Sequence, residues 1–186
     1  MQILKKLVIV SNGGCGKTSL LVTFSTGTFP EANPIFSTYV ADIKVDEKHV
    51  DLSLWDTGRY DRLLPLSYPN SNVVLICFAV DNPSSLQSVL DRWIGEVRHH
   101  CPYVPVVLLG CKKDLRDDPN TIEGLRAIGQ HPVTYKEGMD VAQKIGAKLY
   151  LECSAKAGEG VHEVFQHAAR VALLLPERRK KKCTIL

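Results

Sequence analysis

The chain has 186 residues, of which 45% are hydrophobic and 23% charged, and its formal net charge is +3. This length and composition predict one compact domain with a full hydrophobic core. No run reaches the roughly 20 apolar residues that cross a bilayer, which disfavours a membrane-spanning protein. Much of the positive excess lies in residues 178–182, a local basic tail that is poorly suited to neutralising a long stretch of nucleic acid.

The cysteines and the N-terminus favour a cytosolic protein. Six cysteines without a CxxC pair indicate reduced thiols rather than a disulfide framework. Residues 1–6 lead directly into an apolar strand and lack the long uncharged stretch and cleavage site of a secretory signal. We therefore expect the protein in the cytosol and at the membrane faces that border it.

Strand and helix patterns alternate from the beginning of the chain. An apolar run at 6–10 predicts a strand, and residues 17–24 carry apolar side chains at helical spacing. Residues 39–45 and 49–55 predict a hairpin around the polar turn at 46–48.

The second half of the chain continues the alternation. Continuous apolar runs at 73–80 and 104–110 predict buried parallel strands with a covering helix between them. The remaining predicted elements are a helix over 135–145, a strand over 148–152 and a helix over 161–174. This order predicts a doubly wound α/β domain with a mostly parallel six-stranded sheet, whose ligands bind at the carboxyl ends of the strands.

A glycine-rich segment, Gly13-Gly14-Cys15-Gly16-Lys17-Thr18, joins the first predicted strand to the first predicted helix. Glycines let the backbone curl with its amides inward, and a lysine neutralises phosphate charge that amides alone neutralise poorly. A glycine turn can be merely structural, but the preceding strand and the following Lys17-Thr18 pair favour a phosphate-binding loop in which Thr18 ligates Mg²⁺. Ser11 stands where the usual signature has another glycine, whose backbone is freer.

Trp55-Asp56-Thr57-Gly58 ends the second strand of the predicted hairpin. An aspartate there can hold Mg²⁺ through water, and the amide of Gly58 can contact a γ-phosphate. Taken alone, this segment is more typical of an ordinary turn at the end of a strand. Its place after the phosphate loop favours the metal role.

Two later segments suit a guanine base. In Cys111-Lys112-Lys113-Asp114, the carboxylate of Asp114 can accept hydrogen bonds from N1–H and N2–H of guanine, a donor pair that adenine lacks, while the stem of Lys112 covers the base. In Cys153-Ser154-Ala155-Lys156, a backbone amide can lie near guanine O6. Either segment alone could be a solvated charged turn. In this order, the four segments together predict a guanine-nucleotide site.

The last four residues, Cys183-Thr184-Ile185-Leu186, form a prenylation box. A terminal leucine selects a geranylgeranyl group, which would be attached to Cys183. One lipid chain beside the basic run at 178–182 meets the two-signal condition for stable membrane anchoring. The alternative is a solvated charged tail with an inert cysteine.

With these motifs, the chain resembles the Rho family of small GTPases over essentially its whole length. Five further segments resemble the Rho branch in particular: Phe29-Pro30-Glu31, Tyr39-Val40-Ala41-Asp42, Tyr60-Asp61-Arg62-Leu63, Pro65-Leu66-Ser67-Tyr68-Pro69 and Cys101-Pro102 through Pro105. The resemblance implies the small G-protein fold, a P-loop NTPase, over residues 1–175. It also implies an inserted helix at about 117–131 and a polybasic, prenylated tail over 176–186.

The resemblance further implies GTP as substrate, Mg²⁺ as cofactor, and GDP and phosphate as products. Phe29 should pack edge-on against the guanine, Asp114 should bind it and Lys156 should cover it, while Gly13 and Lys17 support the phosphates. The implied nucleotide-binding residues are Gly13, Gly14, Cys15, Gly16, Lys17, Thr18, Ser19, Phe29, Asp56, Gly58, Lys112, Asp114, Ser154, Ala155 and Lys156. Thr18 and, through water, Asp56 would hold the Mg²⁺.

The family also implies a setting for this activity. Its partners would be exchange factors, GTPase-activating proteins, a guanine-nucleotide dissociation inhibitor, and effectors such as kinases or formins, with no role for nucleic acid. The resemblance implies signalling to the actin cytoskeleton or cell polarity from the cytoplasmic face of membranes, the plasma membrane above all, with a cytosolic pool.

The chain departs from the family pattern where the switching occurs. Family members have Trp-Asp-Thr-Ala-Gly-Gln-Glu-Asp-Tyr-Asp-Arg, whereas this chain passes from Thr57 through Gly58-Arg59 to Tyr60, so three residues are missing, the water-positioning glutamine among them. The segment between Phe29 and Tyr39 is two residues shorter than the pattern, and Cys111 replaces the usual asparagine. We therefore identify no catalytic residue and expect slow hydrolysis.

Two alternatives to a cycling switch follow from these departures. A pseudo-GTPase scaffold would hold nucleotide without turnover. A P-loop nucleotide kinase would prefer ATP, but the arginine-rich lid that it needs is not evident.

Several side chains that could suggest other chemistry are expected to have none. His99, His100, His162 and His167 fall on predicted helix surfaces without metal-ligand spacing, so exposed histidines are favoured over a metal site. Cys15 lies in the phosphate loop and could be redox-sensitive, but an inert thiol is the expectation.

Overall fold

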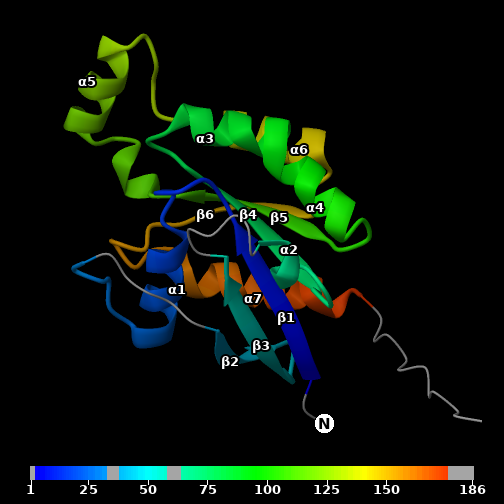
Figure 1. Ribbon diagram of the computed structural model, residues 1–186. Helices are drawn as coiled ribbons and strands as arrows, with labels where there is room; N and C mark the ends of the chain where they lie inside the picture. Colours follow the sequence, from blue (N-terminus) through cyan, green and yellow to red (C-terminus); the bar gives the residue numbers. More distant parts are fainter. Residues whose placement is uncertain (1–2, 33–37, 58–63, 176–186) are drawn as a thin grey trace, which may run out of the picture.

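The computed structural model of the protein describes residues 3–32, 38–57 and 64–175 (Figure 1). Its centre is a six-stranded sheet in the order β2-β3-β1-β4-β5-β6. The strands are β1 (Ile3–Val10), β2 (Tyr39–Val45), β3 (Lys48–Asp56), β4 (Val73–Ala79), β5 (Val106–Cys111) and β6 (Leu149–Glu152). Every neighbouring pair is parallel except β2 and β3, the predicted hairpin. The doubly wound fold is thereby confirmed.

Helices cover both faces of the sheet (Figure 1). One face packs on α1 (Lys17–Thr26) and α7 (Val161–Leu173), and its core contains buried side chains of β1 and β4 such as Leu7 and Leu75. The other face packs on α2 (Leu64–Ser67), α3 (Pro83–Ser88), α4 (Ile94–His100) and α6 (Tyr135–Ile145). Because β4 is buried along its whole length, its seven residues are apolar without alternation.

The helix predicted between the two central strands is interrupted. Between α3 and α4, residues Val89–Trp93 form a π-helical segment, and the amide of Ile94 donates to the carbonyl of Val89. The predicted covering helix is present over Pro83–His100, but its hydrogen bonding departs from the α-helical pattern at this segment, which the apolar spacing does not indicate.

The strand predicted over 104–110 begins two residues later than expected. Val104 belongs to a turn in which its amide donates to the carbonyl of Cys101 at 3.2 Å. Pro105 follows and has no N–H to give to the sheet, although its carbonyl accepts from Val74 at 3.0 Å. The ladder between β4 and β5 therefore starts at Val106.

A short helix projects from the body of the domain at the end that carries the loops (Figure 1). This helix, α5 (Pro119–Ala127), follows the 3₁₀ turn η3 (Lys113–Leu115) and lies inside the range 117–131 predicted for an inserted helix. None of its residues, all of which are described, is buried. Its N-terminus is held by Asp118, whose carboxylate accepts from the amide and the hydroxyl of Thr121 at 2.8 and 2.9 Å.

The last helix returns the chain to the beginning of the first strand. Arg170 in α7 donates to both carboxylate oxygens of Asp46, in the turn between β2 and β3, at 2.9 and 3.0 Å. After α7 ends, the carbonyl of Leu175 accepts from Lys5 Nζ at 3.4 Å. The described chain thus ends beside the start of β1, at the opposite end of that strand from the phosphate loop.

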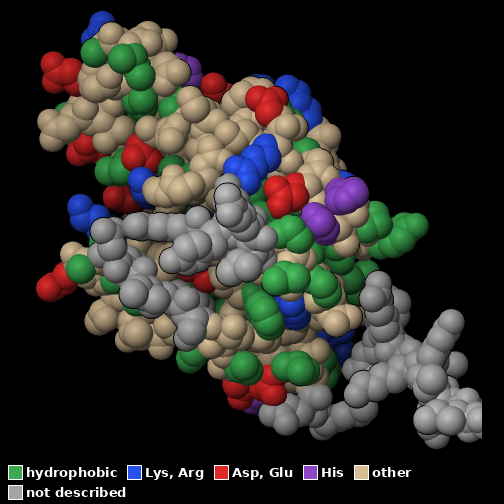
Figure 2. Space-filling model, viewed as in Figure 1, with side chains coloured by type: hydrophobic (Ala, Val, Ile, Leu, Met, Phe, Trp, Pro, Cys, Tyr) green, Lys and Arg blue, Asp and Glu red, His purple; other side chains and the backbone are tan. Residues whose placement is uncertain are grey.

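On the face drawn in Figure 2, acidic and basic side chains are interspersed. Within the three described ranges, none of the helices is long and apolar enough to cross a bilayer.

Candidate functional site

The loops that follow β1, β3, β5 and β6 meet at one end of the sheet, as parallel strands require. The loop after β1 lies at the centre, because β1 pairs with β3 on one side and with β4 on the other. The described residues predicted for nucleotide binding lie in these loops, in the first turn of α1, at the end of β3 or after α1, and Gly58 is the one that falls outside the described residues.

The loop after β1 has the geometry of an anion cradle. Gly14 and Gly16 have φ angles of 78° and 93°, which favour glycine, and Gly16 is the N-cap of α1. The amides at the start of α1 therefore face the loop, where an anion is stabilised by the helix N-terminus. Ser11 is 5% exposed and does not have a positive φ, so at this position a serine fits without the freedom of glycine.

Lys17, at the first position of α1, is 6% exposed. A buried ammonium needs a compensating anion, and the described residues give it no ion pair. A phosphate group in the adjacent loop would supply that charge.

Thr18 and Asp56, the two residues predicted at the metal, are brought together from separate elements. The hydroxyl of Thr18 donates to Asp56 Oδ2 at 2.6 Å. A hydroxyl and a carboxylate are the hard oxygen donors that Mg²⁺ prefers, so the pair fits that ion beside a phosphate. In the described part of the chain, no group of three or more His, Cys, Asp or Glu side chains could hold a metal by itself.

A cavity of about 210 Å³ adjoins the cradle and has the place expected for a base. It is lined by Gly16, Ser19, Leu20, Phe29, Cys111, Lys112, Asp114, Leu115, Cys153, Ala155 and Lys156. A Cβ at Gly16 would stand 3.9 Å from the stem of Lys112, so the phosphate loop and the loop after β5 lie close together. Lys112 itself has φ 60°, an uncommon conformation for a residue with a side chain.

The two loops around this cavity are tied to each other. The amide of Lys113 donates to the carbonyl of Cys153 at 3.1 Å, and Ser154 pairs with Glu159 through two backbone hydrogen bonds of 2.9 and 3.0 Å. Ser154 is fully buried, and its hydroxyl accepts from the amide of Ala157 at 2.9 Å. Gly160 has to be glycine, because a Cβ there would stand 2.7 Å from the carbonyl oxygen of Glu152.

An ion pair that sequence reasoning missed supports the same loops. Arg116 donates to both carboxylate oxygens of Glu152 at 2.8 and 2.6 Å, and its Nε donates to the carbonyl of Val133 at 2.9 Å. The hydrogen bonds to Glu152 raise the pKa of Arg116. The two residues are 36 positions apart in a chain with many charges, and nothing in the sequence indicates that they pair.

The cysteine and histidines set aside in the sequence occupy ordinary environments. Burial raises the pKa of the Cys15 thiol, so the neutral and less nucleophilic form is favoured. His100 stacks on Tyr68 with ring centroids 5.0 Å apart, and His162 lies edge-on to Phe24 at 5.3 Å.

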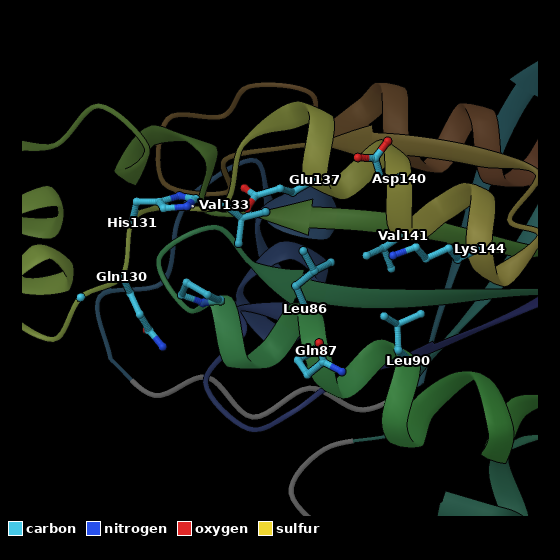
Figure 3. Close-up of a pocket in the computed structure, with 12 residues that line it drawn as sticks. Leu86, Gln87, Leu90, Gln130, His131, Val133, Glu137, Asp140, Val141 and Lys144 are labelled. Carbon is cyan, nitrogen blue, oxygen red and sulfur yellow. Dashed lines mark ion pairs between the residues drawn. The ribbon is translucent and has the colours of Figure 1, made fainter.

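A larger cavity of about 390 Å³ lies away from these loops, between α3 and α6 (Figure 3). Leu86 from α3 and Leu90 from the π-helical segment that follows it face Val141 from α6, and Glu137, Asp140 and Lys144 stand at the rim. None of the described residues predicted for nucleotide binding lines it.

Comparison with known proteins identifies the family. The Ras family matches residues 6–173. GTP-binding protein RHO1 of Candida albicans is 58% identical over 192 residues, which cover all of this chain and 97% of that protein. GTP-binding protein rho5 of Schizosaccharomyces pombe is 56% identical over 196 residues, with 100% and 98% covered, and RHO1 of Saccharomyces cerevisiae is 54% identical over 202 residues, with 100% and 97% covered. The expected resemblance is confirmed, and this chain belongs to the Ras family and, within it, to the Rho-type small GTPases.

Proposed function

We propose that this protein is a membrane-anchored Rho-type switch that binds GTP and GDP with Mg²⁺ and hydrolyses GTP slowly. The observation that carries the proposal is the convergence of the phosphate loop, the Thr18–Asp56 pair and the cavity containing Asp114 at one end of the sheet. This arrangement supports a ligand that has both a phosphate chain and a purine.

Each part of the site has a chemical role in this proposal. The amides around Gly13, Gly14 and Gly16 hold the phosphates, and the Lys17 ammonium neutralises them. Thr18 and, through water, Asp56 hold Mg²⁺, which when bound offsets the charge of the β- and γ-phosphates.

At the base, the carboxylate of Asp114 accepts two hydrogen bonds from guanine, and adenine has no matching donor pair. The stem of Lys112 and the side chain of Lys156 cover the two sides of the ring, with Phe29 edge-on to it. Ser154 shapes the loop so that the amide of Ala155 can approach guanine O6.

Slow hydrolysis is proposed because the segment after Thr57 lacks the family glutamine. In phosphoryl transfer the protein acts by orienting water and stabilising charge, so the loss of a water-positioning side chain falls directly on the rate. The alignment with the C. albicans relative extends over 192 positions, whereas this chain has 186 residues. This chain is therefore the shorter of the two within the aligned region, as expected if residues are missing. A pseudo-GTPase scaffold that holds nucleotide without cycling is favoured by the same missing glutamine.

The anchor and the partners complete the proposal. Cys183 would carry a geranylgeranyl group, and the basic residues at 178–182 would add attraction to an anionic leaflet; both lie outside the described residues. Exchange factors, GTPase-activating proteins, a dissociation inhibitor and effectors such as kinases or formins would act on the protein at the cytoplasmic face of the plasma membrane, in actin or polarity signalling.

Single-turnover phosphate release tests the proposal. The protein is loaded with GTP and Mg²⁺, and bound nucleotide and free phosphate are measured in the same sample. A matched variant replaces Gly58-Arg59 with the family's Ala-Gly-Gln-Glu-Asp, and Lys17→Ala serves as the control that loses nucleotide. We expect stable GTP, slow release, and a rate that rises by roughly 10- to 100-fold in the restored variant.

Each other outcome points to a different conclusion. Release at the same rate before and after restoration would contradict the assignment of slow hydrolysis to the missing residues. Bound GTP with no release in either protein would support the scaffold. A preference for ATP over GTP would overturn the guanine site.

A further inference from the structure

Asn12, which immediately precedes Gly13 in the phosphate loop, is held by two hydrogen bonds to the helix that covers the sheet. Its Oδ1 accepts from the indole Nε1 of Trp93 at 2.7 Å, and its Nδ2 donates to the hydroxyl of Ser88 at 2.9 Å. Because an indole N–H can only donate, the carboxamide oxygen has to face Trp93 and the nitrogen has to face Ser88. The orientation of Asn12 is therefore determined from both sides.

The π-helical segment brings these two partners to the same side of the helix. Ser88 and Trp93 are five residues apart, and in a regular α-helix such residues point about 140° away from each other. Bonding from residue i to residue i+5, as between Val89 and Ile94, widens the turn and returns the fifth residue towards the side of the first. A regular helix at this place could not present both groups to Asn12.

Trp93 is a rigid anchor for this contact. Its side chain is 2% exposed and packs in the same core as Val8 and Val10 of β1, while the guanidinium of Arg92 covers its ring at 4.2 Å from the centroid. Leu86 and Leu90 of the same helix line the cavity of Figure 3. The indole ring therefore cannot move without disturbing the core.

The part of the loop after Asn12 has little support of its own. At both Gly13 and Gly14, no neighbouring atom lies within 4 Å of the place where a Cβ would stand. Both glycines are exposed, and their amides are among the groups proposed to hold phosphate. On the N-terminal side of Gly13, the nearest residue with a side chain held in place is Asn12.

We infer that Asn12 is a positioning residue for the nucleotide phosphates, and that the π-helical segment exists to hold it. This inference rests on the proposed nucleotide site. Asn12 acts through the backbone: by fixing its own peptide, it limits the orientations of the amides at Gly13 and Gly14. A preorganised cradle keeps phosphate bound longer than a mobile one.

The first experiment measures release of a fluorescent GDP analogue from the full chain. The variants are Asn12→Ala, Trp93→Phe and the double variant. Gln87→Ala is the matched control, since it removes a 2.9 Å hydrogen bond to Asp91 on the exposed side of the same helix. We expect each single variant to release GDP roughly three- to tenfold faster, the double variant to be no faster than the faster single variant, and the control to match the wild type.

Additive effects of the two single variants, or release from Asn12→Ala at the wild-type rate, would overturn the inference. In both cases a wild type that retains GDP leaves the proposed function standing, whereas a wild type that holds no GDP contradicts the function itself.

A second measurement covers the case in which these variants do not fold. The chain has two tryptophans, so Trp55→Phe leaves Trp93 as the single indole reporter. The emission of Trp93 is recorded with GDP and Mg²⁺ and after the nucleotide has been removed. We expect the same emission maximum in both states, because the contact between Trp93 and Asn12 is formed before the nucleotide binds. A shift on removal of the nucleotide would show that the contact depends on the ligand, and would overturn the inference.

Discussion

The guanidinium of Arg116 forms a bidentate ion pair with the carboxylate of Glu152, at 2.8 and 2.6 Å. The side chain of Glu152 is 9% exposed and that of Arg116 is 24% exposed, so solvent screens this pair only in part. Arg116 follows the turn that carries Asp114, and Glu152 ends β6 just before Ser154. The pair therefore joins the two loops that surround the cavity proposed for the base.

Arg116→Ala should destabilise the protein, because it removes charge-assisted hydrogen bonds and leaves the carboxylate of Glu152 without its charged partner, with the hydroxyl of Tyr150 still donating to it. We expect the free energy of unfolding in urea to fall by about 1.5–3 kcal/mol. Lys136→Ala, which breaks an exposed pair with Asp140, is the control and should leave stability unchanged. An Arg116→Ala protein as stable as this control would contradict the supporting role of the pair.

Asp114→Asn should change which purine is bound. The amide keeps one acceptor but presents a donor, so guanine loses a hydrogen bond and xanthine, with a carbonyl at the 2-position, gains one. We expect GTP affinity to fall by roughly 100-fold or more and xanthosine triphosphate affinity to rise, measured by competition. Asp117→Asn alters a nearby exposed carboxylate that does not line the cavity and should change neither affinity. Equal losses for both purines would instead indicate a general disturbance of the loop.

Removal of Mg²⁺ should act through Thr18. With a chelator present, the wild type should release GDP faster, because the charge of the β-phosphate is no longer offset. In Thr18→Ala, release should already be fast and should respond less to the chelator. The measurement is the release rate with and without chelator in both proteins. Thr26→Ala, at the end of α1, is the matched hydroxyl control. An undiminished response in Thr18→Ala would remove Thr18 from the metal site.

The hydrophobic patterns of this chain were sufficient to predict its six strands along the sequence and most of its helices, but not the order of the strands within the sheet. Residues 39–45 and 135–145 coincide with β2 and α6, since alternation and helical spacing are strong there and the flanking Thr134 and Gly146 cap α6. The loops of the candidate site follow from the same succession of strands along the sequence. What could not be predicted depends on tertiary contacts: the extra residue of the π-helical turn, which places Trp93 against Asn12, leaves no mark on the spacing of apolar residues.

The stability of α5 should depend on pH through its cap. Hydrogen bonds from Thr121, first of all from its amide, lower the pKa of Asp118 from the usual value of 3.8. A lowered pKa in the folded state means that the stabilisation is present above the unfolded pKa and is lost as pH falls through the lower, folded value. Since α5 buries none of its described side chains, we expect its amides to lose several-fold in hydrogen-exchange protection between about pH 5 and about pH 3.

Asp118→Asn is the matched control for this effect. Asparagine also caps helices but does not titrate in this range, so its α5 amides should keep their protection relative to those of β4. An equal loss in both proteins would mean that acid acts on the whole domain rather than on the cap.

The contact between Lys5 and Leu175 places the end of the described chain at the end of the sheet opposite the phosphate loop. The described chain ends beside the beginning of β1, while the phosphate loop begins at the other end of that strand, roughly 17 Å away at about 3.3 Å per residue. In the proposed anchoring through Cys183, the tail would therefore leave the domain at the end that lies away from the nucleotide. A regulator could then reach the nucleotide site without contacting the residues from which the tail starts.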